Sequence, residues 1–373
     1  MSSVKRIPVL FVTSEVAPLI KTGGLADVAG SLPPALMHAG LDVRVLAPGY
    51  KQVMEGVKSK GRLTSFPALG EMPASQLLAG KLPSGVPLLI VDSPVLYDRP
   101  GGPYQDTSGN DWPDNALRFG LLSYVGAVLG GPASPISWRP RIVHANDWQT
   151  GLTPAYLRFM PGDKARSVMT IHNLAYQGIF PPTTGSRLGL PPSSFAPDGV
   201  EYYGNMSFLK AGLFYADHIT TVSPNYAHEI QQEPLGMGFQ GLLAHRASVL
   251  TGILNGIDTD AWDPETDPYI ARYYNATRLP AKQVFPSVKA AVVPVVKYQF
   301  ERIAAHRFQV EQLHIPLAGL QHFLSSAVPA HLGGRRMHAQ EFKRQVVTRA
   351  VIKRDFQLPG LLVQGDFCRI CHG

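Results

Sequence analysis

The segment KTGGLADV, residues 21–28, places a lysine, two glycines and an aspartate between a strand-like run and a helix-like run. A helix N-terminus presents unpaired N–H groups and a partial positive charge, which favour an anion. Gly23 and Gly24 would let a ligand approach the backbone closely, and Lys21 adds a positive charge. Asp27 can accept hydrogen bonds from hydroxyl groups. The segment indicates a ligand with both phosphate and sugar, although a glycine-permitted turn beside a surface lysine has the same pattern.

Polar residues also close the apolar runs that predict strands. They are Ser14, Glu15, His144, Asn146, Asp147, His172, Asn173 and Asn255. Open parallel sheets bind their ligands at the carboxyl ends of the strands. We therefore expect binding or catalytic groups among these residues.

The elements that must position these residues follow an α/β rhythm. Apolar or β-branched runs at 7–15, 41–48, 87–93, 141–147, 167–173, 218–223 and 249–256 predict strands. Helical patterns at 26–38 and 114–130 lie between strands, and Gly40 is expected to end the first helix. Nearly continuous apolar strands separated by helices predict a parallel sheet that is covered on both faces.

Composition excludes several classes of protein. The 373 residues include two cysteines, too few for a disulfide framework. No apolar run approaches the roughly 20 residues of a membrane-spanning helix, and the start of the chain lacks the layout of a signal peptide. We therefore expect a cytoplasmic protein without a membrane partner.

The net charge of +7 comes from the last part of the chain. Residues 281–373 hold 13 Lys+Arg and 5 Asp+Glu, a net of +8, which leaves a net of −1 for residues 1–280. The basic run GGRRMHAQEFKRQVVTRAVIKR, residues 333–354, lacks a series of interleaved aromatic residues, so we expect a solvated or disordered charged face and no nucleic-acid partner. The change in composition predicts a boundary near 275–283.

Six motifs occur in an order that resembles a known family. They are KTGGLADV, LYDRPGGPY (96–104), HANDWQTGL (144–152), TIHNLAYQGIF (170–180), SFLKAGLFYADHITTVSPNYAHEI (207–230) and LNGIDTDAWDPETD (254–267). Over roughly residues 7–280 the chain resembles the N-terminal half of bacterial glycogen synthases and plant starch synthases. The resemblance implies the GT-B architecture, in which two Rossmann-like domains face each other across a cleft that binds nucleotide-sugar and glucan.

The resemblance also implies roles for individual residues. Lys21, Gly23 and Gly24 would contact the diphosphate and glucose of ADP-glucose, with Asp27 beside them. His172 would lie near the transferred glucosyl group and Asp147 on the glucan side, as the two catalytic residues. Further substrate-binding residues would be Tyr104, Asn173 and Asn255.

The residues themselves leave other interpretations open. His172 could be a hydrogen-bonded histidine at a strand end. Asp147 could be an ordinary helix cap beside a packed tryptophan. Tyr104, in a loop rich in glycine and proline, could be a plain surface aromatic.

The implied reaction transfers glucose from ADP-glucose to the non-reducing end of an α-1,4-glucan such as glycogen, with retention of the α configuration. Its transition state resembles an oxocarbenium ion. We expect no metal and no cofactor, because a helix dipole and cationic side chains can neutralise the leaving diphosphate.

The sequence departs from the family after about residue 280. The family's second domain carries a pattern close to SRLxxQKG, whereas the only SRL here is Ser186–Leu188. We expect an N-terminal domain at 7–256, a linker at 257–280 and an atypical basic tail at 281–373, with the second Rossmann domain absent. A shifted reading frame or a truncated gene is our hypothesis for this change.

Two other functions are weighed against glycogen synthesis. A sugar-nucleotide or glucan-binding protein without turnover would share every N-terminal motif and lack the SRLxxQKG pattern. A dinucleotide-dependent enzyme is disfavoured because no GxGxxG occurs. The CxxCH pattern at 368–372 matches c-type haem attachment, but attachment needs export, so we expect no haem.

Overall fold

The computed structural model describes residues 6–256, 263–270 and 273–275. The chain divides into two compact units, Met1–Ile257 and Asp258–Gly373, and every helix and strand given below belongs to the first. The predicted tail at 281–373, with its CxxCH pattern, lies outside the described residues. The predicted linker is described only in part.

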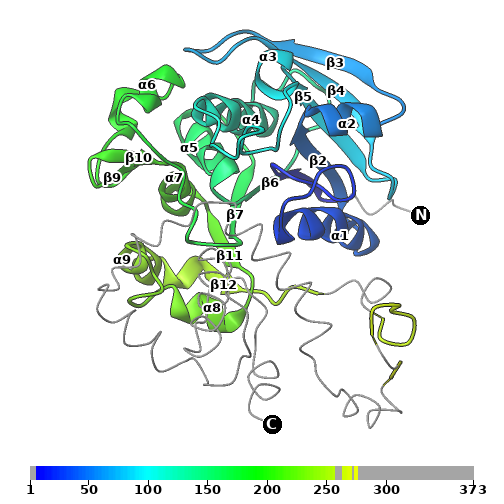
Figure 1. Ribbon diagram of the computed structural model, residues 1–373. Coiled ribbons are helices and arrows are strands. Elements are labelled where there is room, and N and C mark those ends of the chain that lie inside the picture. Colours follow the sequence, from blue (N-terminus) through cyan, green and yellow to red (C-terminus); the bar gives the residue numbers. More distant parts are fainter. Residues whose placement is uncertain (1–5, 257–262, 271–272, 276–373) are drawn as a thin grey trace, which may run out of the picture. The chain divides into compact units, whose positions relative to one another are not determined.

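A nine-stranded sheet forms the centre of the first unit (Figure 1). The strand order is β12-β11-β7-β6-β1-β2-β5-β4-β3, with parallel pairing from β12 to β5 and antiparallel pairing of β4 and β3 at one edge. The strands are β1 (Pro8–Val12), β2 (Asp42–Pro48), β3 (Gly61–Phe66), β4 (Ser75–Lys81), β5 (Pro87–Asp92), β6 (Ile142–Asn146), β7 (Arg166–Ile171), β11 (His218–Thr221) and β12 (Leu250–Gly252). A small antiparallel sheet contains β8 (Ile179–Phe180), β9 (Glu201–Tyr202) and β10 (Asn205–Ser207).

Helices connect the strands. They are α1 (Gly24–His38), α2 (Lys51–Gly56), α3 (Pro94–Tyr97), α4 (Asn115–Gly130), α5 (Leu152–Phe159), α6 (Thr184–Arg187), α7 (Phe208–Tyr215), α8 (Pro224–Glu229) and α9 (Gln240–His245), with 3₁₀ turns η1 (Trp148–Thr150), η2 (Pro192–Ser194) and η3 (Ala247–Val249). Within the described residues, no helix has the length and apolar character needed to cross a lipid bilayer.

The predicted parallel sheet and both predicted helices are confirmed. Each of the seven predicted runs contains a strand, and every one of these strands except β2 stops before its run ends because the last residues enter loops at the sheet edge. The first helix ends at His38, and Gly40 follows with a φ of +91° that suits glycine, as predicted. Strands β3 and β4 were not predicted, because the mostly exposed β3 has no apolar run.

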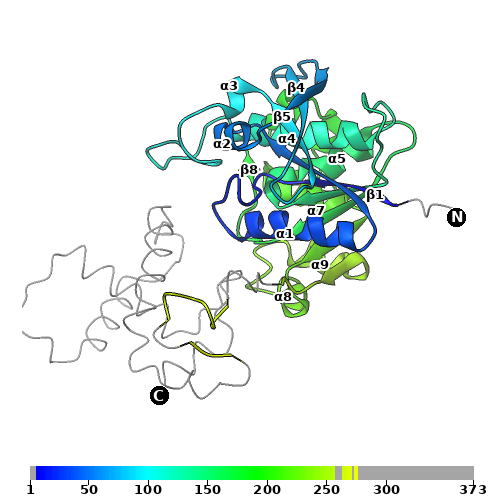
Figure 2. The ribbon, with the colours of Figure 1, turned by 90° about the vertical axis from the view of Figure 1, so that its right-hand side faces the viewer.

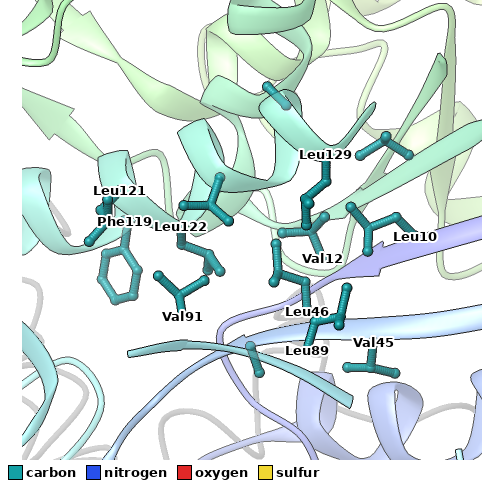
Figure 3. Packing of buried hydrophobic residues seen from close by; sticks show 14 of the residues in the cluster. Leu10, Val12, Val45, Leu46, Leu89, Val91, Phe119, Leu121, Leu122 and Leu129 are labelled. Atoms are coloured by element: carbon teal, nitrogen blue, oxygen red, sulfur yellow. The ribbon is translucent and has the colours of Figure 1, made fainter. Parts of the chain in front are cut away.

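The core lies between the sheet and α4. Apolar side chains of α4 pack toward β1, β2 and β5 (Figure 3). Almost every residue of α4 is buried, because the helix also packs against α5. An added Cβ at Gly130 would lie 2.6 Å from Val143 Cγ2, so glycine permits the close approach of helix and strand. Helix α1 lies on the other face of the sheet, as right-handed β–α–β connections require (Figure 2).

The chain order reverses between β1 and β6. From β1 the chain proceeds to β2 on one side of the sheet, and from β6 it proceeds to β7 on the other side. Val12 pairs with both Leu46 and Ala145, so neighbouring strands end at the same edge. Such a switch point creates the crevice in which α/β sheets bind ligands. The loops after β1, β6 and β7 therefore meet where a ligand is expected.

Candidate active site

Glu15, three residues beyond β1, fixes the KTGGLADV loop through hydrogen bonds to its carboxylate. Its carboxylate is almost fully buried, with 2% of the residue exposed. The backbone N–H of Thr22 donates to Oε2, the Thr22 hydroxyl donates to Oε1 at 2.6 Å, and the Gly23 N–H reaches Oε2 at 3.3 Å. A buried carboxylate that accepts several hydrogen bonds is well satisfied. Glu15 thus fixes the backbone that leads into α1.

Tyr104 connects a second loop to the same carboxylate. Its hydroxyl donates to Glu15 Oε1 and lies 2.9 Å from Ser14 Oγ. Burial raises the pKa of the Tyr104 hydroxyl well above its usual range, and the negative charge of Glu15 raises it further. Tyr104 is half-buried and hydrogen-bonded, so it is not a plain surface aromatic.

Arg118 of α4 anchors the loop that carries Tyr104 at its start and directly before Tyr104. The guanidinium is buried and donates to the carbonyl oxygens of Leu96 at 2.9 Å and Pro103 at 2.7 Å. Asn115 accepts a bond from Arg118 at 2.7 Å and donates to the Tyr104 carbonyl at 2.9 Å. These bonds fix the Tyr104 backbone relative to the sheet.

Gly23 and Gly24 are not required by the fold. An ideal Cβ at either position meets no atom within 4 Å, and neither residue has a positive φ. By contrast, a Cβ at Gly151 would lie 2.1 Å from the Phe208 carbonyl oxygen, so that glycine is needed for packing. Within the described part of the chain, the N–H groups of Gly24 and Leu25 at the start of α1 donate to no partner. The loop therefore presents an open backbone surface with unpaired donors.

Lys21 and Asp27 form an ion pair beside this surface. Lys21 Nζ lies 2.6 Å from Asp27 Oδ1, and both side chains are more than half exposed. Exposed ion pairs contribute little to stability, because water competes for both partners. Either side chain can therefore exchange its partner for a ligand at small cost.

Asp147 follows β6 with a strained backbone. Its φ of 57° and ψ of 179° lie in a region that glycine adopts almost exclusively. The side chain does not cap η1, so the interpretation of Asp147 as an ordinary helix cap is wrong. Instead, Oδ1 accepts the backbone N–H groups of His172 at 2.8 Å and Asn173 at 3.3 Å. The strained residue thereby connects the ends of β6 and β7.

The Asp147 carboxyl lies in an unfavourable electrostatic environment. Burial raises its pKa to about 7, although the two backbone N–H bonds act in the opposite direction. The negative charge of Glu15 also raises this pKa, which shows that the loops after β1 and β6 influence each other.

His172 lies at the end of β7, half-buried, with a neutral ring. Burial lowers its pKa to about 3, and neighbouring His144 contributes to the shift. His172 Nε2 lies 3.1 Å from Asn146 Oδ1. Burial likewise lowers the pKa of His144 to about 4, and its Nε2 lies 2.6 Å from Thr170 Oγ1.

The two predicted asparagines differ in their surroundings. Asn173 Oδ1 accepts the N–H of Ala175 at 3.0 Å, so this oxygen shapes its own turn. Asn255 is exposed, three residues beyond β12 and on the same edge of the sheet. The structure thus brings Asp147, His172 and Asn173 into direct contact and leaves Asn255 two strands away from β7.

Sequence reasoning did not assign roles to Glu15, Asn146 or Arg118. The first two were noted as polar residues at strand ends, and that position was the available signal. Arg118 lies within an apolar helix, where an isolated arginine gives no indication of its partners. Among the described residues, no group of three or more His, Cys, Asp or Glu side chains is arranged to hold a metal ion.

The parallel sheet, its switch point and the polar loops around it define a Rossmann-like domain of the GT-B architecture. The family described as "Starch synthase catalytic domain" matches residues 8–245, and the chain belongs to this family.

The chain is similar to curated glycogen synthases and to a solved starch synthase. A glycogen synthase of Nitrosomonas europaea is 58% identical over 280 residues, which cover 74% of this chain and 57% of the relative. A glycogen synthase of Nitrosospira multiformis is 55% identical over 286 residues, covering 76% and 58%. The catalytic domain of starch synthase IV from Arabidopsis thaliana, bound to ADP and acarbose, matches with a TM-score of 0.63 and 28% identity, covering 74% and 57%. The chain spans less than two thirds of the length of each.

Proposed function

We propose that this chain acts as a glycogen synthase, transferring glucose from ADP-glucose to the non-reducing end of an α-1,4-glucan with retention of configuration. The observation that best supports the proposal is the open Gly23–Gly24 backbone, which Glu15 holds at the switch point of the sheet. The solved starch synthase relative was bound to ADP and acarbose, a nucleotide and an oligosaccharide analogue.

In this proposal the β1 side of the site binds the donor. The unpaired N–H groups at the start of α1 and the charge of Lys21 attract the diphosphate. Asp27 exchanges its bond to Lys21 for a hydroxyl group of the ligand. Tyr104 and Asn255 are further donor contacts.

The β6–β7 side would surround the transferred glucosyl group. A positive charge develops on the sugar ring in an oxocarbenium-like transition state, and a neutral His172 adds no opposing charge. Its low pKa keeps the imidazole neutral at physiological pH. Asp147 lies on the glucan side, and Asn173 is a substrate contact beside it. The backbone and side chains of Asn146, Asp147 and His172 are held by hydrogen bonds before a ligand binds, which favours catalysis through preorganisation.

The test is incorporation of labelled glucose from ADP-glucose into glycogen by the purified 373-residue chain, beside Lys21→Ala. Lys164→Ala is a matched control, because among the described residues Lys164 Nζ donates only to the carbonyl oxygens of Arg158 at 3.1 Å and Met160 at 2.8 Å. Incorporation that falls with Lys21→Ala and persists with Lys164→Ala supports the proposal. The same assay with UDP-glucose tests the donor preference, and we expect ADP-glucose to be preferred.

Calorimetric titration with ADP-glucose separates the remaining outcomes. Binding that depends on Lys21 but gives no incorporation would support the sugar-nucleotide-binding protein without turnover. A folded chain that neither binds ADP-glucose nor incorporates glucose would overturn the proposal.

A further inference from the structure

Asn146 is fully buried at the end of β6, and its amide orientation is fixed. The side-chain nitrogen donates to the carbonyl oxygens of Val12 at 3.0 Å and His144 at 3.3 Å. Both amide protons have acceptors on this side, so the oxygen must face the opposite way. The reverse orientation would place the amide oxygen against two carbonyl oxygens, which is repulsive.

The backbone of Asn146 is also held. Its N–H donates to Thr150 Oγ1 at 2.5 Å, and its carbonyl accepts from the same hydroxyl at 2.8 Å. The side chain therefore starts from a fixed backbone and ends in two fixed hydrogen bonds. Asn146 cannot readily turn its oxygen away from its neighbour.

That neighbour is the ring of His172. The Asn146 Oδ1 atom lies 3.1 Å from His172 Nε2. An amide oxygen can only accept a hydrogen bond, so Nε2 must carry the proton. A histidine tautomer is inferred from such a network, and here the network admits one answer.

We propose that Asn146 is a positioning residue that holds His172 as the Nε2–H tautomer, so that Nδ1 accepts a hydrogen bond from a hydroxyl group of the transferred sugar. The second half of this inference rests on the proposed function. The first half is a property of the unliganded chain. Burial of the ring, which lowers its pKa to about 3, keeps Nδ1 unprotonated at physiological pH.

In the part of the chain that the structure describes, no hydrogen bond or ion pair from another donor or charged group reaches the His172 ring. Asp147 accepts from the backbone N–H of His172. His144 engages Thr170 through its own Nε2. Among the described residues, Asn146 is the only hydrogen-bond partner of the His172 ring.

An acceptor at Nδ1 makes the site specific for a hydroxyl group at one carbon of the sugar. Nδ1 requires a hydroxyl group that donates a proton, and a fluorine substituent at the same carbon cannot donate. One monofluorinated derivative of ADP-glucose should therefore bind about tenfold more weakly than ADP-glucose, the effect of one lost hydrogen bond. Replacement of His172 by Ala, which has no side-chain acceptor, should remove that difference.

The first test is nitrogen NMR of the complete chain with ¹⁵N-labelled histidines and no ligand. The chain has 12 histidines, and His172→Gln identifies the signals of this ring by their loss. We expect two-bond couplings and shifts of a neutral ring that is protonated at Nε2. A ring protonated at Nδ1, or an equal mixture of tautomers, would overturn the inference whether or not ADP-glucose binds.

Two variants then test the role of Asn146. Asn146→Asp keeps an acceptor oxygen, so the Nε2–H tautomer should persist, and the added negative charge should raise the pH at which His172 takes a second proton. Asn146→Ala removes the acceptor and should give mixed tautomers. Asn110→Ala, at an exposed loop position, is the matched control and should leave the signals of His172 unchanged. Unchanged signals in folded Asn146→Ala would contradict the proposed role.

Discussion

On the β1 side of the candidate site the groups that face solvent are glycine backbone and an exposed ion pair, whereas on the β6–β7 side the polar groups are largely buried. Lys21 and Asp27 are more than half exposed, while Asp147 is 8% exposed. Both sides are held by a carboxylate that accepts backbone N–H groups, Glu15 on one side and Asp147 on the other.

The difference shows how one site can combine adaptability with fixed geometry. An exposed ion pair costs little to break, so the β1 side can accept a ligand that brings its own charge. A buried polar group without a partner costs free energy, so Asn146 and Asp147 on the β6–β7 side are hydrogen-bonded within the protein before any ligand arrives, whereas His172 Nδ1 is left for the ligand. The strain at Asp147 persists because the surrounding bonds hold it.

The largest effect is expected from Glu15→Ala. The substitution leaves partly buried donors of Thr22, Gly23 and Tyr104 without their acceptor, so the free energy of unfolding should fall by about 3 kcal/mol. Urea unfolding measures it. Glu71→Ala, which breaks the exposed pair with Arg187 at 2.7 Å, should lower the free energy of unfolding far less, because water competes for both partners. Equal losses in the two variants would refute the role of Glu15 as the support of the loop.

A smaller effect separates strain from bonding at Asp147. Both Asp147→Ala and Asp147→Gly remove the carboxylate, but only glycine is relaxed at φ 57° and ψ 179°. The glycine variant should therefore be more stable than the alanine variant by about 1–3 kcal/mol in urea unfolding. The same two substitutions at exposed Asp163, which does not have a positive φ, serve as the control. There the alanine variant should be slightly more stable than the glycine variant. If alanine is also the more stable replacement at Asp147, the backbone there is not strained.

The buried histidines predict how stability depends on pH. Folding lowers the pKa of His144 to about 4 and of His172 to about 3, from an unfolded value of about 6.5. Between about pH 4 and 6.5 the unfolded chain binds the extra protons, so these two groups make stability rise with pH and fall on acidification. Asp147 acts in the opposite direction. Its raised pKa of about 7 means that, over much of this range, the folded chain holds a proton on this carboxyl group that the unfolded chain has lost.

His144→Gln isolates one of these contributions. Between pH 4.5 and 6, the free energy of unfolding of the variant should rise with pH less steeply than that of the unsubstituted chain, by up to about 1.4 kcal/mol per pH unit. The reason is that the variant takes up one proton fewer on unfolding. Urea unfolding at a series of pH values measures the difference from the unsubstituted chain. Parallel curves for the two proteins would show that His144 is not held neutral by burial.

The sequence allowed the sheet and its polar edge to be predicted, because each apolar strand run and the polar residues after it are adjacent in the sequence. The contact between the loops after β6 and β7 followed from the parallel sheet. The role of Glu15 could not be predicted, since its hydrogen-bond donors include Tyr104, 89 residues further along the chain. The backbone strain at Asp147 was also hidden, because an aspartate in the sequence does not reveal its φ.

The ligand-facing part of the β1 side was predicted from residue types, but the reason for its glycines required the structure. Lysine and glycine at a helix start indicate an anion site whether or not the fold itself needs the glycines. A side chain at Gly23 or Gly24 would meet no atom of the protein, so packing does not require glycine there. At Gly151 and Gly130 a side chain would clash, so packing does require glycine. Glycine residues of one chain thus serve different purposes, which sequence patterns alone do not distinguish.

The most direct test of this account is Gly24→Ala, with unfolding free energy and ADP-glucose affinity measured on the same sample. Gly24 is the first residue of α1, and its added methyl group meets no atom of the protein. We predict that the variant is more stable by about 0.5–1 kcal/mol, as alanine favours a helix, and that it binds ADP-glucose at least about tenfold more weakly. An unchanged affinity in the stabilised variant would contradict the claim that these glycines are kept for a ligand.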